Sequence, residues 1–160
     1  MILRKVGILL FLMLAASAAL GSSESAFETF NGFEGKWTIR SGQKALPIEM
    51  TYDSGSKESI VTEQFGKELS VIYLDGENLL MTHFCNVGNQ PRLRLKEGGQ
   101  PGVLEFDMFD ITNAKTPGDA HVQKIIYKVV DDKHLELEIV WRKGNSEESE
   151  KYSLTRIISD

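Results

Sequence analysis

The chain has 160 residues, with 18 basic and 23 acidic side chains and a single cysteine. A net charge of −5 argues against a nucleic-acid binder, which needs a basic face, and one cysteine excludes an internal disulfide. This length is that of one domain, which must be held together by an ordinary hydrophobic core.

Residues 1–21 have the pattern of a secretory signal peptide. Arg4 and Lys5 precede an apolar run at 6–14, and small residues follow at 15–19 and 21. A basic start, a short apolar stretch and a small-residue cleavage zone are typical of exported proteins. The run is shorter than the roughly 20 apolar residues that span a bilayer. We therefore expect a periplasmic or extracellular protein with no membrane span in the mature chain.

Cleavage is expected between Ala19 and Ser25, and the loss of Arg4 and Lys5 leaves 16 basic and 23 acidic residues, a net charge of −7. One domain is expected at residues 26–160. The first segment of this domain, residues 26–35 (AFETFNGFEG), is the one stretch that looks helical. It is short and precedes the first expected strand.

The remainder of the domain predicts strands. In residues 46–52 and 134–142 apolar side chains alternate with polar ones, which indicates strands with one buried face. Turn residues such as Asp75-Gly76 separate the strands. We expect a solvated hairpin loop in the polar run 142–151. The ten expected strands are 36–41, 46–52, 58–64, 69–74, 79–85, 92–97, 103–111, 121–130, 134–142 and 150–157.

Ten short consecutive strands predict an all-β fold, a closed antiparallel up-and-down β-barrel with a short N-terminal helix. A barrel of this size is either filled by side chains or able to hold one small ligand. The helix would pack across one end. A two-sheet sandwich is the alternative.

A meander brings every second connection to the same end of the barrel. The turns near 53–57 and 98–102 are tight, whereas the connections 86–91 and 112–120 at the other end are longer and richer in reactive side chains. The residues expected to gather at this mouth, as ligand-binding candidates, are His83, Cys85, Asn89, Gln90, Arg92, Asp110, Asn113 and His121.

The orientation of these side chains decides their chemistry. His83 and Cys85 share one face of their strand, but the sequence leaves open whether that face is the interior. An inward Arg92 would bind a carboxylate or phosphate group and would need Asp110 or Glu105 as a partner. An outward Arg92 would belong to a solvated strand face.

Three kinds of chemistry are open to the two histidines and the cysteine. Cys85 could act as a nucleophile with His83 or His121 as the base, or it could be a buried structural thiol. His83, Cys85 and His121 could bind zinc or copper, and either histidine could ligate haem. Alternatively, the two histidines could form hydrogen bonds alone.

Two sequence segments carry resemblances. FEGKWT (33–38) resembles the G-x-W motif of lipocalin-type, calycin-like barrels, in which the tryptophan packs across the barrel base. MTHFCNVGNQPRLR (81–94), with 106–114 and 119–127, resembles a group of uncharacterised exported bacterial proteins with a Thr-His-Tyr-Cys…Gly-Asn-Gln-Pro-Arg segment. Phe84 stands where tyrosine is usual, which removes a hydroxyl. The resemblance implies a lipocalin-like barrel and a mouth that includes Pro91, and it implies no reaction.

We thus expect a protein that binds a small, partly apolar ligand in the cup of the barrel, with Arg92 and the two histidines at its polar end. The first alternative is a metal-binding, haem-binding or enzymatic protein that uses His83, Cys85 and His121. The second is a structural or interaction module with a filled core. No catalytic residue and no particular cofactor are assigned, and an enzyme is the less favoured reading.

Overall fold

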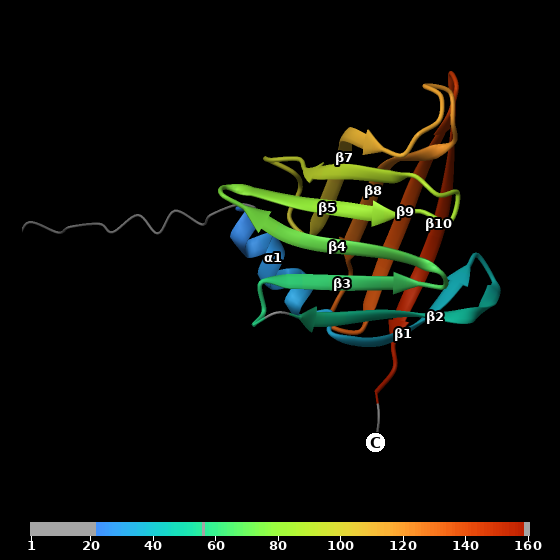
Figure 1. Cartoon of the computed structure of the whole chain (residues 1–160). Coiled ribbons are helices and arrows are strands. Elements are labelled where there is room, and N and C mark those ends of the chain that lie inside the picture. Colours follow the sequence, from blue (N-terminus) through green and yellow to red (C-terminus); the bar gives the residue numbers. More distant parts are fainter. Residues whose placement is uncertain (1–21, 56, 159–160) are drawn as a thin grey trace, which may run out of the picture.

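The chain forms one closed barrel of ten antiparallel strands (Figure 1). The computed structural model describes residues 22–55 and 57–158, so the predicted signal peptide lies outside the described residues. Each strand pairs with the next in sequence and β1 closes on β10, which confirms the predicted up-and-down barrel and excludes the sandwich. The elements are α1 (Ser23–Asn31), β1 (Gly35–Ser41), β2 (Lys44–Gly55), β3 (Ile60–Phe65), β4 (Glu68–Asp75), β5 (Asn78–Phe84), β6 (Gln90–Leu95), β7 (Val103–Thr112), β8 (His121–Val129), β9 (His134–Lys143) and β10 (Ser146–Arg156).

Helix α1 closes one end of the barrel (Figure 1). It begins earlier than the predicted 26–35, because the Ser22 hydroxyl accepts a hydrogen bond from the Ser25 N–H at 3.1 Å and caps the first turn. It also ends earlier, at Asn31. Gly35 has a φ of 122°, a conformation that glycine adopts readily, and it turns the chain into β1.

The half of the barrel next to α1 is filled by aromatic side chains. The ring of Phe30 meets the rings of Phe106 and Tyr127 edge-on, with centroid distances of 5.8 and 5.1 Å. Trp37 is fully buried and donates its indole N–H to the Phe33 carbonyl at 2.9 Å. Each of these edge-to-face pairs adds about 0.5–1.5 kcal/mol to the burial of the rings. This half of the interior is therefore a packed core.

The polar run at 142–151 forms an exposed hairpin, as predicted, but the predicted extent of its loop is wrong. Residues from Ser146 onward pair with β9, starting with Ser146 opposite Lys143, so that the hairpin turn is only two residues long. The apolar alternation is missing there because both faces of this hairpin are exposed. An ion pair between Arg142 and Glu147 joins the two strands instead.

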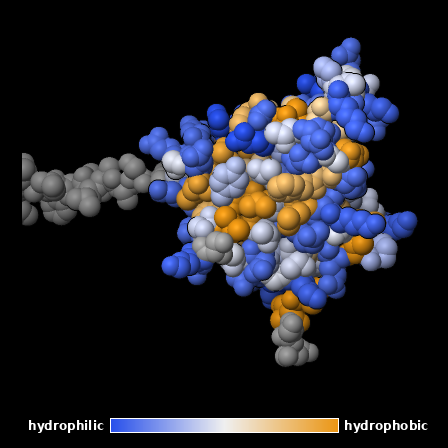
Figure 2. Space-filling model, viewed as in Figure 1, coloured by the Kyte–Doolittle hydropathy of each residue, from blue (hydrophilic) through white to orange (hydrophobic). Residues whose placement is uncertain are grey.

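The outer surface in Figure 2 is mostly polar, with apolar side chains gathered over β4 and β5. Phe84 of β5 is one of the exposed large hydrophobic residues, at 44% exposure. Its neighbours in the alternation, Met81, His83 and Cys85, are buried. This settles the orientation that the sequence left open: His83 points inward and Phe84 points outward. No helix in the described part of the chain is long and apolar enough to cross a membrane.

Candidate functional site

The end of the barrel opposite α1 carries the predicted mouth residues. It is formed by the β3–β4 turn, the β5–β6 and β7–β8 connections and the β9–β10 hairpin. The structure divides the eight predicted residues into two sets. Those buried at this end are His83, Cys85, Asn89 and His121, whereas Gln90, Arg92 and Asp110 lie on the outer surface of β6 and β7, and Asn113 is exposed just after β7.

The outer set forms its own surface contacts. Arg92 donates to Asp110 at 3.0 Å, and the two side chains are 39% and 45% exposed. Arg92 and Arg94 both lie over the ring of the exposed Phe109, at 5.2 and 4.8 Å from its centroid. The expectation of an inward Arg92 is therefore corrected, although its predicted partner Asp110 is the right one. Leu93 takes the inward position on β6, because burial alternates along this strand.

The inner wall of the mouth brings Glu68, His83 and Cys85 together. The Cys85 thiol donates to Oε1 of Glu68 at 3.5 Å, and Nε2 of His83 lies 4.0 Å from the same oxygen. One potential ligand atom from each residue lies within 4.8 Å of the other two, and no other such group of three exists in residues 22–55 and 57–158. All three residues are less than 9% exposed. They form the clearest candidate site for a metal ion.

The third member of this group is Glu68, and the expected His121 is not part of it. His121 is buried at the start of β8, where its Nδ1 lies 2.8 Å from the carbonyl oxygen of Asp119. That carbonyl can only accept, so Nδ1 is the protonated nitrogen of His121. Asn89 is close by, since its side-chain N–H donates to the Ala120 carbonyl at 2.8 Å. The predicted set of His83, Cys85 and His121 is thus corrected.

A row of polar side chains crosses the barrel interior behind the site. Cross-strand pairing sets Glu63 of β3 beside Ser70 of β4, and Ser70 beside His83 of β5. The Ser70 hydroxyl donates to Glu63 at 3.2 Å and lies 3.0 Å from Nδ1 of His83. The Tyr127 hydroxyl donates to the other oxygen of Glu63 at 2.6 Å.

The charge state of Glu63 sets the tautomer of His83. An ionised Glu63 accepts the one hydroxyl hydrogen of Ser70, and Nδ1 of His83 is then the donor to Ser70. Nε2 then carries a lone pair. This atom is buried and has no hydrogen-bond partner within the described structure, and the carboxylate of Glu68 is the charged group beside it.

Burial governs the protonation of these groups. It lowers the pKa of His83, although the charge of Glu68 acts in the opposite direction. Burial also raises the pKa of the Cys85 thiol to about 11 and raises the pKa of Glu63 despite the hydrogen bonds that it accepts. At neutral pH Cys85 is a thiol, which disfavours its use as a nucleophile in the protein as it stands.

A pocket of about 440 Å³ adjoins the site at the mouth. Its lining includes Glu68 and Asn86, together with Glu150 and Tyr152 of β10. The rings of Phe65 and Tyr152 meet edge-on at 5.4 Å. The full lining is Ile48, Phe65, Gly66, Lys67, Glu68, Asn86, Ile139, Trp141, Glu150 and Tyr152. Most of this surface is apolar or aromatic.

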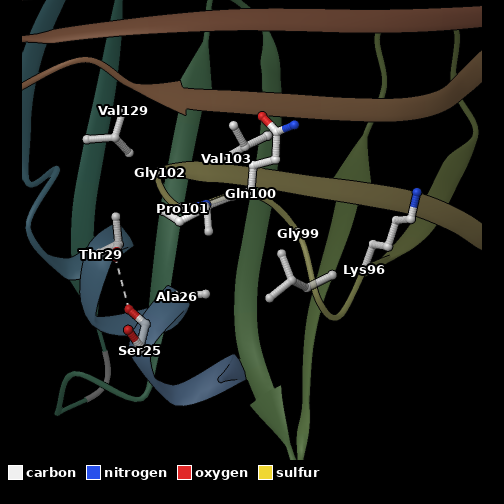
Figure 3. A pocket seen from close by; sticks show the side chains of 12 residues that line it. Ser25, Ala26, Thr29, Lys96, Gly99, Gln100, Pro101, Gly102, Val103 and Val129 are labelled. Atoms are coloured by element: carbon white, nitrogen blue, oxygen red, sulfur yellow. Dashed lines mark hydrogen bonds between the residues drawn. The ribbon is translucent and has the colours of Figure 1, made fainter. Parts of the chain in front are cut away.

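A smaller pocket of about 300 Å³ lies at the closed end, between α1 and the turn at residues 98–102 (Figure 3). Ser25, Ala26 and Thr29 of α1 face Pro101 and Val103 across it (Figure 3). Thr29 uses its hydroxyl within the helix, on the carbonyl of Ser25. Its polar lining side chains are Ser25, Thr29, Lys96 and Gln100, and none of the buried unpartnered side-chain atoms in residues 22–55 and 57–158 belongs to it.

Sequence reasoning missed Glu63, Glu68 and Ser70, and a usable signal was present. The predicted hairpin tip at Asp75-Gly76 sets the register, in which Asp75 lies opposite Asn78. Counting back from the tip places Ser70 opposite His83 and continues to Glu68 beside Cys85. A polar residue opposite an inward histidine is itself inward.

Comparison with known proteins bears on the fold alone. No protein-family model and no curated protein matches this chain. Among solved structures, the crystal structure of Rv2717c from M. tuberculosis is similar, with a TM-score of 0.51 and 12% sequence identity over 83% of this chain and 98% of that chain. At this identity the similarity supports a shared barrel architecture and carries no inference about activity.

Proposed function

We propose that this protein binds a small, partly apolar molecule in the mouth pocket of the barrel. The observation that carries the proposal is the pocket of about 440 Å³ at the mouth, lined by Phe65, Trp141 and Tyr152. Small-molecule sites typically have volumes of about 300–1,000 Å³, mostly apolar walls and a few polar groups. The packed aromatic half beside α1 confines such a ligand to the mouth.

The polar groups around the pocket favour a ligand with hydrogen-bond donors or a positive charge. Glu68 and Glu150 supply two carboxylates, against one cation, Lys67. Trp141 has a buried indole N–H that finds no partner in the described part of the chain, so a ligand with one acceptor beside its donor would match it. Arg92 is no part of this recognition, because it lies on the outer face. An amine or an alcohol on an apolar body is therefore preferred over a carboxylate.

The proposal is tested with three probes that share one body and differ in their polar end: 2-phenylethylamine, 2-phenylethanol and 3-phenylpropionate. Titrations followed by protein NMR should show the amine binding at least about tenfold tighter than the carboxylate. A tenfold difference corresponds to about 1.4 kcal/mol. The perturbed resonances should belong to the pocket residues.

A matched pair of surface variants provides the control. Ile48→Arg adds bulk and positive charge at the rim of the pocket, where Ile48 is 39% exposed. Val130→Arg makes the same kind of change at an exposed site at the other end of the barrel. Binding of the amine should fall at least about tenfold in the first variant and stay unchanged in the second. The proposal is wrong if no probe binds or if both variants bind equally.

A further inference from the structure

We propose that Glu68, His83 and Cys85 form a binding site for a divalent transition-metal ion of the zinc class. The site lies on the inner wall of the barrel beside the mouth pocket. This inference goes beyond the binding of a small molecule and stands without it, because it rests on three side chains of β4, β5 and the residue that follows β5.

The ligand atoms have the right chemistry and nearly the right spacing. An imidazole nitrogen, a thiolate sulfur and a carboxylate oxygen are the three donor types that zinc uses in proteins. Bond lengths of about 2.0–2.3 Å in a tetrahedral arrangement require separations of roughly 3.4–3.6 Å between ligand atoms. The Cys85 sulfur and Oε1 of Glu68 are 3.5 Å apart, and Nε2 of His83 is 4.0 Å from that oxygen. The ligand atoms of Cys85 and His83 lie within 4.8 Å of each other, so the side chains would have to close by up to about 1 Å to complete the geometry.

The free lone pair of His83 is the independent observation that points to a cation. Nε2 is buried, has no hydrogen-bond partner within residues 22–55 and 57–158, and lies 4.0 Å from Oε1 of Glu68. With Glu63 ionised, this nitrogen carries the lone pair of the ring. A lone pair that faces a buried carboxylate is unfavourable unless a positive ion lies between them. A metal ion would satisfy both groups at once.

The hydrogen bonds behind His83 orient its ring in the way that metal sites require. A histidine that binds metal through Nε2 usually donates its Nδ1 hydrogen to a carboxylate or another acceptor, which fixes the ring and strengthens the ligand. Here Nδ1 of His83 donates to Ser70, and Ser70 donates to Glu63. The buried carboxylate of Glu63 thus supports His83 through one hydroxyl group.

The backbone holds the other two ligands in place. The Asn86 N–H donates to Oε1 of Glu68 at 3.2 Å. The Cys85 N–H donates to the Asn89 carbonyl at 3.1 Å, and the Gly88 N–H donates to the Cys85 carbonyl at 2.9 Å. This tight turn fixes the position of the cysteine before any ion arrives. Binding would replace the thiol hydrogen by the metal, with release of one proton to solvent.

Three protein ligands leave one tetrahedral position open, as in catalytic zinc sites. Glu68 belongs both to the cluster and to the lining of the mouth pocket. The open position would therefore be filled by water or by a small ligand that enters through the mouth. The three charged side chains around that pocket are Lys67, Glu68 and Glu150.

The test is a titration of the untagged, reduced protein with Co²⁺ and then with Zn²⁺. We expect one ion per chain, an absorption band from sulfur-to-cobalt charge transfer, and displacement of cobalt by zinc. Cys85→Ser should remove the charge-transfer band. Replacing any ligand, as in Cys85→Ser, His83→Gln or Glu68→Gln, should weaken zinc binding by more than about 100-fold, the upper end of what loss of an outer partner costs.

Two histidine variants are matched controls. His134 pairs with Asp131 on the surface at the closed end, and His121 lies outside the cluster. His134→Gln and His121→Gln should keep the stoichiometry, the band and the affinity within about twofold. Circular dichroism checks that each variant is folded, and Cys85→Ser carries the test if the other ligand variants do not fold.

The proposal is overturned if the protein takes up neither Co²⁺ nor Zn²⁺. It is also overturned if Cys85→Ser binds as tightly as the parent, or if the loss follows His134→Gln or His121→Gln instead. Because no organic probe is present, failure of small-molecule binding leaves this result unaffected.

Discussion

The two ends of the barrel are built on opposite principles. At the end closed by α1, apolar rings pack against one another and the one indole N–H is bonded to a carbonyl. At the mouth, buried polar atoms lack partners: His83 Nε2, Asn89 Oδ1, His121 Nε2, Gln123 Oε1 and Trp141 Nε1. All five of these residues lie at strand ends or connections of the mouth. In residues 22–55 and 57–158, satisfied packing thus holds the fold at one end, and the buried polar atoms without a partner lie at the other end, where we propose that a ligand binds.

The largest expected effect lies at the closed end. Phe30→Ala would remove a ring that is 0% exposed and contacts Phe33, Phe106 and Tyr127. Such truncations cost about 3–5 kcal/mol. Denaturant unfolding of the variant should show a decrease in the free energy of unfolding in this range. The zinc affinity of the folded variant should equal that of the parent. A decrease of less than about 1 kcal/mol in the free energy of unfolding would contradict the view that this end holds the packed core.

At the mouth, truncation should affect binding more than stability. Zinc at 100 times its dissociation constant should stabilise the parent protein by about 2.7 kcal/mol. His83→Leu should abolish this gain and lower the metal-free stability by no more than about 1.5 kcal/mol, because it removes a buried nitrogen without a partner together with one hydrogen bond, between Nδ1 and Ser70. Thermal melts with zinc and with a chelator measure the stabilisation by zinc and the stability of the metal-free protein. A metal-free variant several kcal/mol less stable than the parent would show that His83 serves the fold.

The polar row between the two ends should give a pH signature. Burial raises the pKa of Glu63 in the folded state above its unfolded value, so the folded protein binds more protons between these two pKa values. Stability therefore falls as pH rises through that window, by at most about 1.4 kcal/mol per pH unit for one group. In Glu63→Gln this slope should be absent, which unfolding curves in chelator from pH 4 upward can measure. An identical slope in parent and variant would contradict the assignment.

The smallest effect is expected on the outer wall. Arg92 and Asp110 form a half-exposed pair, and such pairs contribute about 0–1 kcal/mol. Arg92→Ala should lower stability by no more than about 1 kcal/mol, reduced further at high salt, and leave both zinc and amine binding unchanged. Loss of amine binding in Arg92→Ala would show that Arg92 takes part in ligand binding after all.

The sequence predicts the barrel well because strand alternation and turn residues are local signals. It could not orient His83, since both faces of residues 79–85 carry apolar side chains, and only the exposure of Phe84 decides the matter. The sequence placed Arg92 at the correct end of its strand but favoured the wrong face. An arginine can lie on either face of a strand, and only its contacts with neighbouring strands decide which. Glu68 could have been found from the hairpin register, whereas the bond from Tyr127 to Glu63 joins strands that no local pattern relates.

The most direct test of a binding mouth opposite a packed end is an anomalous difference map from a zinc-soaked crystal, recorded at the zinc absorption edge. We predict one strong peak per chain, within about 2.0–2.3 Å of Nε2 of His83, Sγ of Cys85 and a carboxylate oxygen of Glu68. The absence of a peak there, or a peak confined to surface groups such as His134 and Asp131, would contradict it.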